Sequence, residues 1–579
     1  MDKVSIINRQ LPITLDGEVP VTSAKTQNRK ALIIGLDGAT FDVMDPLLAA
    51  GELPHLAKLM ADGVWGRLRS TLPPNSAPAW TAFLTGKNPG HYGILNFRYL
   101  DLHNYSGYTS RFASSAAFAG RTFLDAMSQQ GRGVVAYRVP MTYPVWPVRG
   151  VMVAGYPTPD RRQAYTFPPE LGEELTPIAL HSHDEILGAG VAEERRNADF
   201  EIEAIEQTMS RFLQAGEQDL YVCVSGITDG FQHKFWKYVD PQHSLYDPAE
   251  AAQHGDIIAE YYRKLDGMVG RLVAQAGSDW LVIVMSDHGG GPRPGQALNL
   301  NAWLQQMGWL QVRTGRKRPL HRATRRLVEW ARHSFPFPDW ANRHLPERVK
   351  LRISEVRSNA GLVDWARTRA YRVDLQYPAQ GIEINLRGRQ PEGIVELGAE
   401  YEALRSEILD ALRGLTDPDD GRPLVREAYR REEVYAGPFL EEMPDIVLLT
   451  DPAYQGGDET DLLITEVPHS FLSRFSGDHL MEGVLMMRGE GLIRRGERVE
   501  GAEITDLAPT ILYALGCPVP QDMDGRVLEE ALEPGVLAHH PVVHGKPLGD
   551  VREGAATGEV YSDEDEEGIR KALEGLGYI

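Results

Sequence analysis

The chain has 579 residues, of which 42% are hydrophobic, and a formal net charge of -21 at pH 7. This length is sufficient for a large α/β core with insertions, and the hydrophobic content is ordinary for a globular protein. The negative charge argues against binding of a nucleic acid duplex, because phosphate backbones are bound by clustered lysines and arginines. Charged mononucleotides are not excluded, since bound metal ions can invert a local electrostatic field.

The N-terminal segment and the cysteines predict a cytoplasmic protein. Residues 1–30 carry charges throughout and lack the apolar stretch of a secretory signal, so we expect a flexible N-terminal arm. The only two cysteines, Cys223 and Cys517, provide neither a disulfide framework nor a thiolate metal site, which favours a reducing compartment. No apolar run approaches the roughly 18 residues that a membrane span requires.

The remaining chain divides into four segments. In residues 31–301, short β-rich runs alternate with helical patterns, as in βαβ units around a mainly parallel sheet. Residues 302–435 begin with amphipathic, Arg-rich helices and are interpreted as an inserted cap. Residues 436–534 return to the α/β core, and residues 535–579 form a tail that ends in a short helix. The predicted fold class is therefore α/β, with a core in two parts.

Six potential metal ligands are distant in sequence, yet each lies at or just beyond an apolar β-type run or its following turn. They are Asp37, Asp229, His233, Asp287, His288 and His479. Side chains at the carboxyl ends of parallel strands converge on one edge of an α/β sheet. Three carboxylates brought together would repel one another without bound cations. The set predicts two divalent metal ions, zinc first, with manganese or iron as alternatives.

The local spacing of these residues supports the same interpretation. Asp229 and His233 are four residues apart, which directs both side chains to one face of a helix. Asp287 and His288 are followed by Gly289–Gly291, where glycine permits close approach of the backbone. Any one of these residues taken alone is better explained as a cap or a buried structural residue. The complete set favours a metal site.

A proline-rich loop at residues 71–75 leads to Ser76, at the start of an apolar helix. Pro78 suits the first turn of a helix, and the free amides of such a turn can hold a phosphoryl oxygen. Ser76 in isolation would be interpreted as an N-cap. Beside six metal ligands, it becomes a candidate nucleophile.

These motifs resemble the alkaline phosphatase superfamily, in particular its type I phosphodiesterase and nucleotide pyrophosphatase branch. The resemblance lies in the segments 35–38, 71–93, 229–233, 286–289 and 477–479. Further segments, at 139–144, 381–389 and 506–512, are similar to a group of predicted phosphohydrolases and phosphomutases. The resemblance implies a three-layer sandwich with a mainly parallel central sheet and an inserted helical cap.

The resemblance also implies a role for each site residue. One metal ion would be bound by Asp229, His233 and His479, and the other by Asp37, Asp287, His288 and the Ser76 oxygen. Ser76 would attack phosphorus and form a phospho-serine intermediate, because a bound cation lowers the pKa of an attached hydroxyl. Asn96 would donate a hydrogen bond to a phosphate oxygen, although a turn residue is an equally good interpretation of this asparagine.

The residues after Ser76 narrow the expected chemistry. A sulfatase needs an arginine after the Ser-x-Pro sequence, and alkaline phosphatase grips monoesters with an arginine beside its serine, whereas here Ala77, Pro78 and Ala79 follow. We therefore expect hydrolysis of a phosphodiester or pyrophosphate bond in a small phosphorylated substrate, which includes nucleotides. The alternatives are a phosphomutase similar to cofactor-independent phosphoglycerate mutase, a phosphomonoesterase, and a non-catalytic binding protein. The oligomeric state is not predicted.

Overall fold

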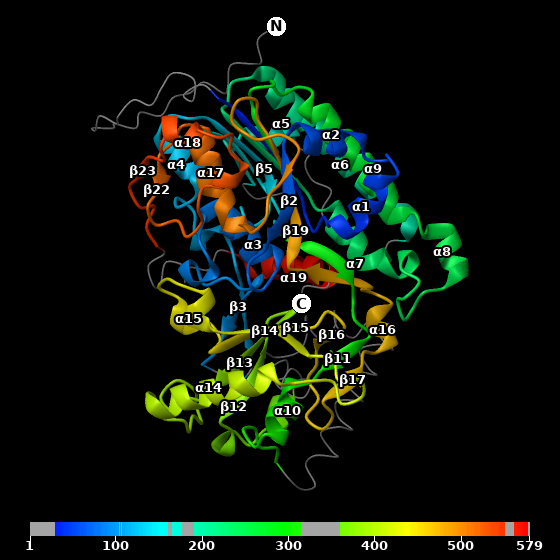
Figure 1. The fold of residues 1–579 in the computed structure, drawn as a ribbon, viewed down its shortest axis with the longest axis vertical. Helices are drawn as coiled ribbons and strands as arrows, with labels where there is room; N and C mark the ends of the chain where they lie inside the picture. Colours follow the sequence, from blue (N-terminus) through cyan, green and yellow to red (C-terminus); the bar gives the residue numbers. More distant parts are fainter. Residues whose placement is uncertain are drawn as a thin grey trace.

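The computed structural model describes residues 29–103, 105, 107–159, 165–175, 190–313, 359–550 and 561–576. The described residues contain a ten-stranded central sheet (Figure 1). Its strands run in the order β20 (Glu497–Arg498), β2 (Val64–Arg69), β19 (Glu482–Arg488), β9 (Leu281–Met285), β1 (Ala31–Leu36), β8 (Leu220–Ser225), β5 (Val134–Val139), β6 (Gly150–Ala154) and β7 (Thr166–Phe167). The remaining strand, β21 (Ala502–Glu503), pairs with β2.

The centre of this sheet is parallel and fully buried. Strand β1 pairs in parallel with both β8 and β9, and β5 pairs in parallel with β8 and β6. Strands β1, β8 and β9 are continuous runs of buried residues, as expected for strands covered on both faces. Strand β19 is antiparallel to its two neighbours, β9 and β2. The sheet is mixed but mostly parallel, which confirms the predicted α/β fold.

Helices cover the sheet in two layers (Figure 1). One group in mutual contact contains α3 (Ser76–Thr85), α4 (Phe123–Gln129) and α17 (Leu507–Ala514). The other contains α1 (Phe41–Ala49), α2 (Pro54–Asp62), α6 (Val191–Ala215), α7 (Ile227–Val239) and α9 (Ile257–Val273). Buried residues recur at helical spacing along α9, from Ile258 through Tyr262 and Leu265 to Leu272, so one face of this helix packs inward.

A second, antiparallel sheet lies below the main sheet in the view of Figure 1. Its order is β12 (Ala370–Asp374), β13 (Ala379–Ile384), β15 (Ile446–Thr450) and β14 (Val425–Arg430), and α14 (Ala399–Arg413) contacts β14. It has its own hydrophobic core, mostly from residues 298–454. Because β15 belongs to this sheet, the sheet extends beyond residue 435, the predicted end of the insertion. The segment boundaries themselves stay predictions.

Shorter elements complete the described fold. The paired strands are β3 (Arg98–Asp101) with β4 (Gly107–Phe112), β10 (Gly289–Pro292) with β18 (Gly477–Leu480), β11 (Gln296–Leu298) with β16 (Tyr454–Gly456) and β17 (Ile464–Glu466), and β22 (Val519–Pro520) with β23 (His544–Gly545). The short helices are α5 (Leu171–Leu175), α8 (Pro248–His254), α10 (Leu300–Gln306), α15 (Arg431–Val434), α16 (His469–Leu472) and α18 (Val536–His539), with α19 (Asp563–Leu576) near the C-terminus.

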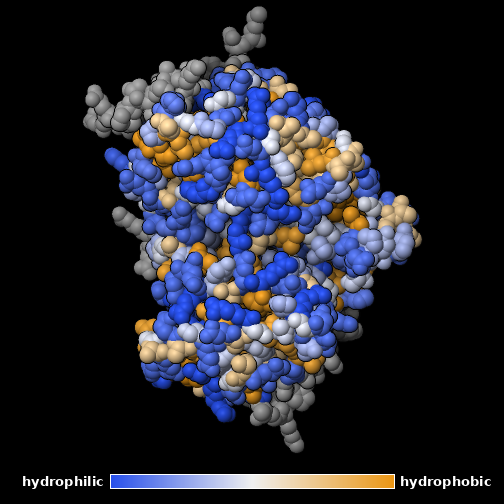
Figure 2. All heavy atoms as spheres, in the orientation of Figure 1, coloured by the Kyte–Doolittle hydropathy of each residue, from blue (hydrophilic) through white to orange (hydrophobic). Residues whose placement is uncertain are grey.

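Two sequence predictions fall mostly or wholly outside the described residues. These are the N-terminal arm, of which only Arg29 and Lys30 are described, and the Arg-rich helices, which lie mainly in residues 314–358. On the face shown in Figure 2, hydrophilic side chains predominate and hydrophobic ones form small separate patches. Among the described helices, none combines the length and the apolar character that crossing a membrane requires.

Candidate metal centre

Two neighbouring parallel strands deliver three of the predicted ligands to one edge of the main sheet. Asp37 follows β1 directly, and Asp287 and His288 lie between β9 and β10. Gly38 adopts a left-handed conformation, with a φ of 68°, and a Cβ there would approach Asp229 to 3.0 Å. This tight turn lets the Gly38 amide donate to Asp287 Oδ1 at 3.2 Å.

The other three predicted ligands approach from α7 and β18. Asp229 and His233 share one face of α7, with His233 Nε2 3.2 Å from Asp229 Oδ1. His479 lies in β18 opposite Gly290 of β10, and its Nε2 is 3.5 Å from the same Asp229 oxygen. A short antiparallel pair of strands therefore joins the segments that carry His288 and His479.

Ser76 joins this group from the opposite helical layer. It is the first residue of α3, which the Asn75 side chain caps by accepting from the Ala77 amide at 3.0 Å. Ser76 Oγ lies 3.3 Å from Asp37 Oδ1 and 3.1 Å from His288 Nε2. The structure thus brings Ser76 and all six predicted ligands to one place, and each is at most 6% exposed.

The three imidazole rings share one hydrogen-bonding pattern. The Nδ1 atoms of His233, His288 and His479 lie 2.9–3.0 Å from the backbone carbonyl oxygens of Gly477, Gly289 and Pro74, respectively. A carbonyl only accepts, so each Nδ1 carries a proton and Nε2 is the ring nitrogen that faces the carboxylates. Burial opposes protonation of His233, but Asp229 outweighs it and raises the pKa of His233. His233 Nε2 and His479 Nε2 are 3.0 Å apart. Two lone pairs at this distance are favourable only with a cation or proton near them; two nitrogens on a tetrahedral zinc ion stand about 3.3 Å apart.

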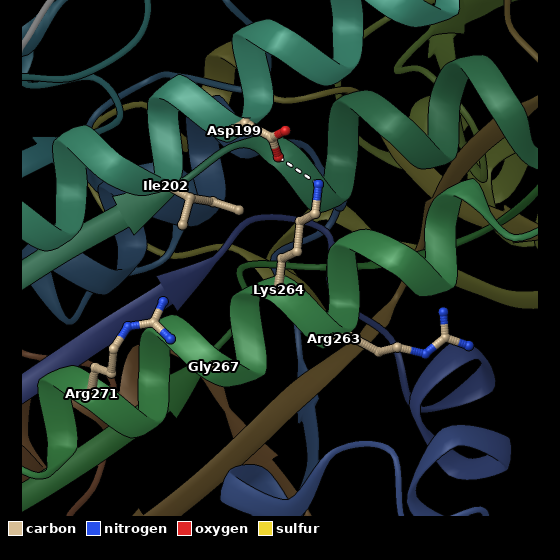
Figure 3. A pocket seen from close by; sticks show the side chains of 6 residues that line it. All are labelled: Asp199, Ile202, Arg263, Lys264, Gly267 and Arg271. Carbon is tan, nitrogen blue, oxygen red and sulfur yellow. Dashed lines mark hydrogen bonds and ion pairs between the residues drawn. The ribbon is translucent and has the colours of Figure 1, made fainter.

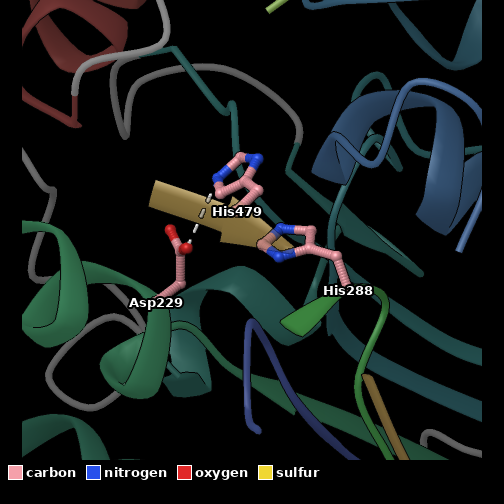
Figure 4. A group of neighbouring side chains, drawn as sticks. All are labelled: Asp229, His288 and His479. Atoms are coloured by element: carbon pink, nitrogen blue, oxygen red, sulfur yellow. Dashed lines mark ion pairs between the residues drawn. The ribbon is translucent and has the colours of Figure 1, made fainter. Parts of the chain in front are cut away.

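The ligand atoms converge in two adjoining groups. One consists of Asp229, His288 and His479, drawn in Figure 4, and the other of Asp37, Asp287 and His288. His288 belongs to both, so two bound cations would be neighbours. Carboxylate oxygens and imidazole nitrogens are the donors that zinc, manganese and iron accept. The residues present therefore fit a pair of divalent metal ions.

Electrostatics within the group also favour bound cations. Burial, followed by repulsion from Asp287 and Asp229, raises the pKa of Asp37 well above its ordinary value. Burial and Asp229 raise the pKa of Asp287 to about 6. Burial opposes ionisation of Asp229 as well, but its histidine neighbours outweigh it and hold the pKa of Asp229 well below the ordinary value. Burial lowers the pKa of His288 and His479, which keeps both rings in the neutral, ligating form.

Several supporting contacts were not predicted from the sequence. The indole Nε1 of Trp80 donates to Asp37 Oδ2 at 2.9 Å, and Gln232 Nε2 donates to the Gly38 carbonyl at 2.7 Å. Trp80 follows Ser76 by four residues in one helix, so the spacing carries a signal that both side chains face the same way. These contacts orient Asp37 and the turn after it, as partners of metal ligands commonly do.

Asn96 is 1% exposed, but its described contact is with Tyr108 rather than with Ser76 or the six ligands. Its Nδ2 donates to the Tyr108 hydroxyl at 3.3 Å, whereas its Oδ1 has no hydrogen-bond partner among the described residues. The role of Asn96 in binding a phosphate oxygen stays a prediction.

A shallow pocket on the helical surface differs from this site. It has a volume of 240 Å³ and is lined by residues of α6 and α9, including Asp199, Arg263, Lys264 and Arg271 (Figure 3). Lys264 pairs with Asp199 at 2.6 Å, while Arg263 and Arg271 pair with carboxylates outside the pocket lining. Because its cations are neutralised by neighbouring acids, the pocket offers no charge centre comparable to the buried group.

Comparison with known proteins places this site in a family context. The model of a family described as type I phosphodiesterase / nucleotide pyrophosphatase matches residues 31–462. Among solved structures, the chain is similar to human ectonucleotide pyrophosphatase / phosphodiesterase 5, with 14% identity, a TM-score of 0.46, and coverage of 87% of this chain and 100% of that one. It is also similar to phosphonoacetate hydrolase from Sinorhizobium meliloti 1021 in complex with phosphonoformate, with 14% identity, a TM-score of 0.49, and coverage of 85% and 96%. No curated protein sequence matches the chain.

Proposed function

Because the chain belongs to the type I phosphodiesterase / nucleotide pyrophosphatase family, we propose that it hydrolyses phosphodiester or pyrophosphate bonds of a small phosphorylated substrate, with Ser76 as the nucleophile. One observation carries the proposal: the Ser76 hydroxyl lies within 3.3 Å of both Asp37 Oδ1 and His288 Nε2, inside a buried group of metal-binding side chains. A hydroxyl so placed can be activated, whereas a serine in water is a weak nucleophile.

The proposed division of the ligands is the one that the family resemblance implies, and it differs from the geometric grouping by placing His233, rather than the shared His288, with Asp229 and His479. Asp229, His233 and His479 would hold one divalent ion, and Asp37, Asp287, His288 and the Ser76 oxygen would hold the other. When bound, the two ions would supply the Lewis acidity that lowers the pKa of a hydroxyl and offsets charge on a phosphoryl group. Zinc is the first candidate for this mixture of nitrogen and oxygen donors, and manganese and iron are compatible with it.

The chain's own residues would orient the reacting groups. Ser76 Oγ would form a bond to phosphorus while the bond from phosphorus to the departing oxygen breaks, leaving phospho-serine. Asp37 Oδ1 and His288 Nε2 flank Ser76 Oγ, so a cation held by these two atoms would also reach the hydroxyl and favour release of its proton to solvent. Trp80 holds the other Asp37 oxygen, so Oδ1 stays directed at Ser76. Water would then release the phosphoryl group and restore the serine.

The preference for diesters rests on the segment after Ser76. This segment consists of Ala77, Pro78, Ala79 and Trp80, which are all buried. It contains no arginine that could bind the second negative charge of a monoester. A phosphodiester group carries a single negative charge, whereas a phosphomonoester carries up to two. The side chains that follow the nucleophile therefore suit a substrate in which one phosphate oxygen bears a further substituent.

A substrate panel tests this proposal. The purified protein, supplied with zinc or manganese, is assayed on bis(4-nitrophenyl) phosphate, 4-nitrophenyl phosphate, 4-nitrophenyl sulfate and a dinucleotide. We expect turnover of the diester, which the Ser76→Ala variant loses by at least about 1,000-fold. Ser70→Ala is the matched control, because Ser70 is also buried but its hydroxyl has no hydrogen-bond partner among the described residues. Equal turnover by Ser76→Ala would overturn the proposal, and isomerisation of phosphoglycerate without phosphate release would identify a phosphomutase.

A further inference from the structure

The loop that precedes Ser76 is held at three points. His479 Nδ1 donates to the Pro74 carbonyl at 2.9 Å, from the side of the metal centre. The Tyr435 hydroxyl donates to the Leu72 carbonyl at 2.6 Å, and Asn75 Nδ2 donates to Gln376 Oε1. Tyr435 follows α15, and Gln376 lies in the turn between β12 and β13, so two of the three contacts come from the region of the second sheet. The second sheet therefore reaches the residue next to the candidate nucleophile.

Gln376 adopts a backbone conformation that its residue type disfavours. Its φ is 66°, in the left-handed region that glycine and asparagine occupy far more readily than glutamine. The turn is closed by two hydrogen bonds, from the Gln376 amide to Asp374 Oδ1 at 3.3 Å and from the Ala379 amide to the Gln376 carbonyl at 2.9 Å. Strained residues of this kind persist where the surrounding structure requires them, often at functional sites. Here the left-handed conformation is explained by the contact that the Gln376 side chain makes with Asn75.

Asn75 transmits this contact to the start of helix α3. Its Oδ1 accepts from the Ala77 amide at 3.0 Å, and its Nδ2 donates to Gln376. A side-chain amide has an accepting end and a donating end, so fixing the donating end fixes the direction of the other. Gln376 thereby sets the orientation of the N-cap of α3, and Ser76 is the first residue of that helix.

The same turn reaches a second residue of the proposed site. The Asp374 carbonyl accepts from the Tyr108 hydroxyl at 2.8 Å, and that hydroxyl accepts from Asn96 Nδ2 at 3.3 Å. Asp374 and Gln376 are two residues apart on one turn. This single turn therefore fixes both the residue before Ser76 and the partner of Asn96.

We propose that Gln376 is a positioning residue, which holds Asn75 so that the Ser76 hydroxyl stays aligned with the reacting phosphorus. Through Gln376, the second sheet would help to position the nucleophile, although the nucleophile and the metal ligands themselves lie around the main sheet. The kinetic consequence rests on the proposed function. The structural consequence, an ordered segment at residues 72–77, does not, so the two can be tested separately.

Gln376→Gly separates the side chain from the strain of the turn. Glycine accepts a positive φ, and this relief of strain should offset part of the cost of leaving Asn75 without its hydrogen-bond acceptor, so the midpoint of thermal unfolding should change little. The kcat for bis(4-nitrophenyl) phosphate should fall by about 10- to 100-fold, because small misplacement of a reacting group has effects of this size. The KM should change by less than about 3-fold, since Gln376 acts through Asn75 rather than on the substrate.

Two matched variants identify the contact that matters. Asn75→Ser keeps a hydroxyl that can cap α3 but is too short to reach Gln376, so its kcat should fall as in Gln376→Gly, and the double variant should fall no further. Gln376→Glu keeps an acceptor for Asn75 and should retain most of the wild-type kcat. Additive losses in the double variant would overturn the proposed coupling.

Hydrogen exchange in the full chain provides a measurement that needs no activity. Gln376→Gly should speed amide exchange in residues 72–77 at least about 10-fold, while Gln376→Glu leaves it near the wild-type rate. Unchanged exchange in this segment together with a wild-type kcat would overturn the role of Gln376. Absence of diester turnover in the wild type would instead overturn the proposed function, and the exchange rates would still decide the role of Gln376.

Discussion

Two buried groups of carboxylates lie in the two sheets, and their charges are balanced in different ways. In the second sheet, Glu383 and Asp445 are both 0% exposed, and Arg389 Nη2 lies 2.5 Å from an oxygen of each. In the main sheet, Asp37 and Asp287 each pair with His288, and neither has a lysine or arginine partner among the described residues. The two groups are therefore buried to a similar extent, but only the group in the second sheet has an arginine partner.

This difference distinguishes a structural ion network from a site that needs a ligand. Burying a carboxylate is costly unless it is paired, so the second sheet contains arginine cations that stabilise its own acids. Burial and neighbouring carboxylates raise the pKa of Glu383 as well as those of Asp37 and Asp287, so the two groups differ in their cationic partners: among the described residues, Glu383 pairs with an arginine, whereas Asp37 and Asp287 pair with an imidazole. The positive charge missing from the main-sheet group is what two divalent ions would provide. The first group should therefore govern stability and the second should govern activity.

Breaking the arginine pairing should produce the largest change in stability. Arg389→Met leaves Glu383 and Asp445 buried with less positive charge, and we expect the free energy of unfolding to fall by about 3–5 kcal/mol. Denaturant unfolding measures this loss. Arg387→Met is the matched control, because Arg387 pairs with Glu396 at an exposed position and should cost at most about 1 kcal/mol. Equal effects from the two variants would remove the distinction between the groups.

Removing a carboxylate from the main-sheet group should affect activity more than folding. Asp287→Asn keeps the size of a side chain that is 0% exposed, but it removes one proposed metal ligand. We expect kcat/KM for an aryl phosphodiester to fall by about 100- to 1,000-fold, as when one group that stabilises charge in a transition state is lost. The metal-free variant should unfold no more easily than the metal-free wild type. A stability loss as large as that of Arg389→Met would contradict the comparison.

Chelation should weaken the main-sheet group alone. Ions that bind only the folded protein stabilise it by about 2.7 kcal/mol per site at 100 times their Kd. Dialysis against a chelator should therefore lower the unfolding midpoint of the wild type, and added zinc should restore it. Arg389→Met should show the same chelator-dependent decrease, since its ion network lies elsewhere. A wild-type midpoint that ignores the chelator would show that the carboxylates of the main sheet are stable without metal.

A smaller effect is expected from a third charged cluster, at the end of the loop after α3. His91 lies 3.3 Å from Asp524 and 2.8 Å from Asp550, and Lys87 lies 3.0 Å from Asp550. Burial opposes protonation of His91, but the two aspartates outweigh it and raise the pKa of His91. The pKa values of Asp524 and Asp550 are lowered despite burial, chiefly by His91 and Lys87, respectively.

The sign of the pH dependence follows from these directions. Because the pKa of His91 is raised on folding, the contribution of His91 to stability is complete below about pH 6.5. This contribution is lost as the pH rises through the folded-state pKa. Because the pKa values of the two aspartates are lowered on folding, their contribution to stability is complete above about pH 4 and is lost as the pH falls through the folded-state pKa values. His91→Gln should therefore reduce stability by at most about 1 kcal/mol near pH 5 and by less at pH 8. Unfolding curves at the two pH values measure this difference, and a larger loss at pH 8 would contradict it.

The sequence alone predicted the site residues that lie at the ends of strands. Asp37 and Asp287 follow runs of buried residues in neighbouring parallel strands, so their meeting at one edge required only the α/β fold. The i to i+4 spacing of Asp229 and His233 likewise predicted that both side chains lie on one face of a helix. Both the fold class and the family were confirmed.

The parts that sequence did not predict depend on how distant turns dock. Gln376 contacts Asn75 across 301 residues, and no periodicity or motif relates the two positions. Strand β15 pairs with β13 and β14 rather than with the main sheet, although its run of buried apolar residues suits either sheet. Tertiary packing decides such pairings, because local patterns establish only that a strand is buried.

The most direct test of the central claim is the number of divalent ions bound to the wild-type chain. Equilibrium dialysis against zinc, followed by elemental analysis, should give two ions per chain, and His479→Ala should retain one. A wild-type chain that binds no zinc, manganese or iron at millimolar concentration, while folded and with Ser76 intact, would contradict the claim that the buried carboxylates and imidazoles form a two-metal site.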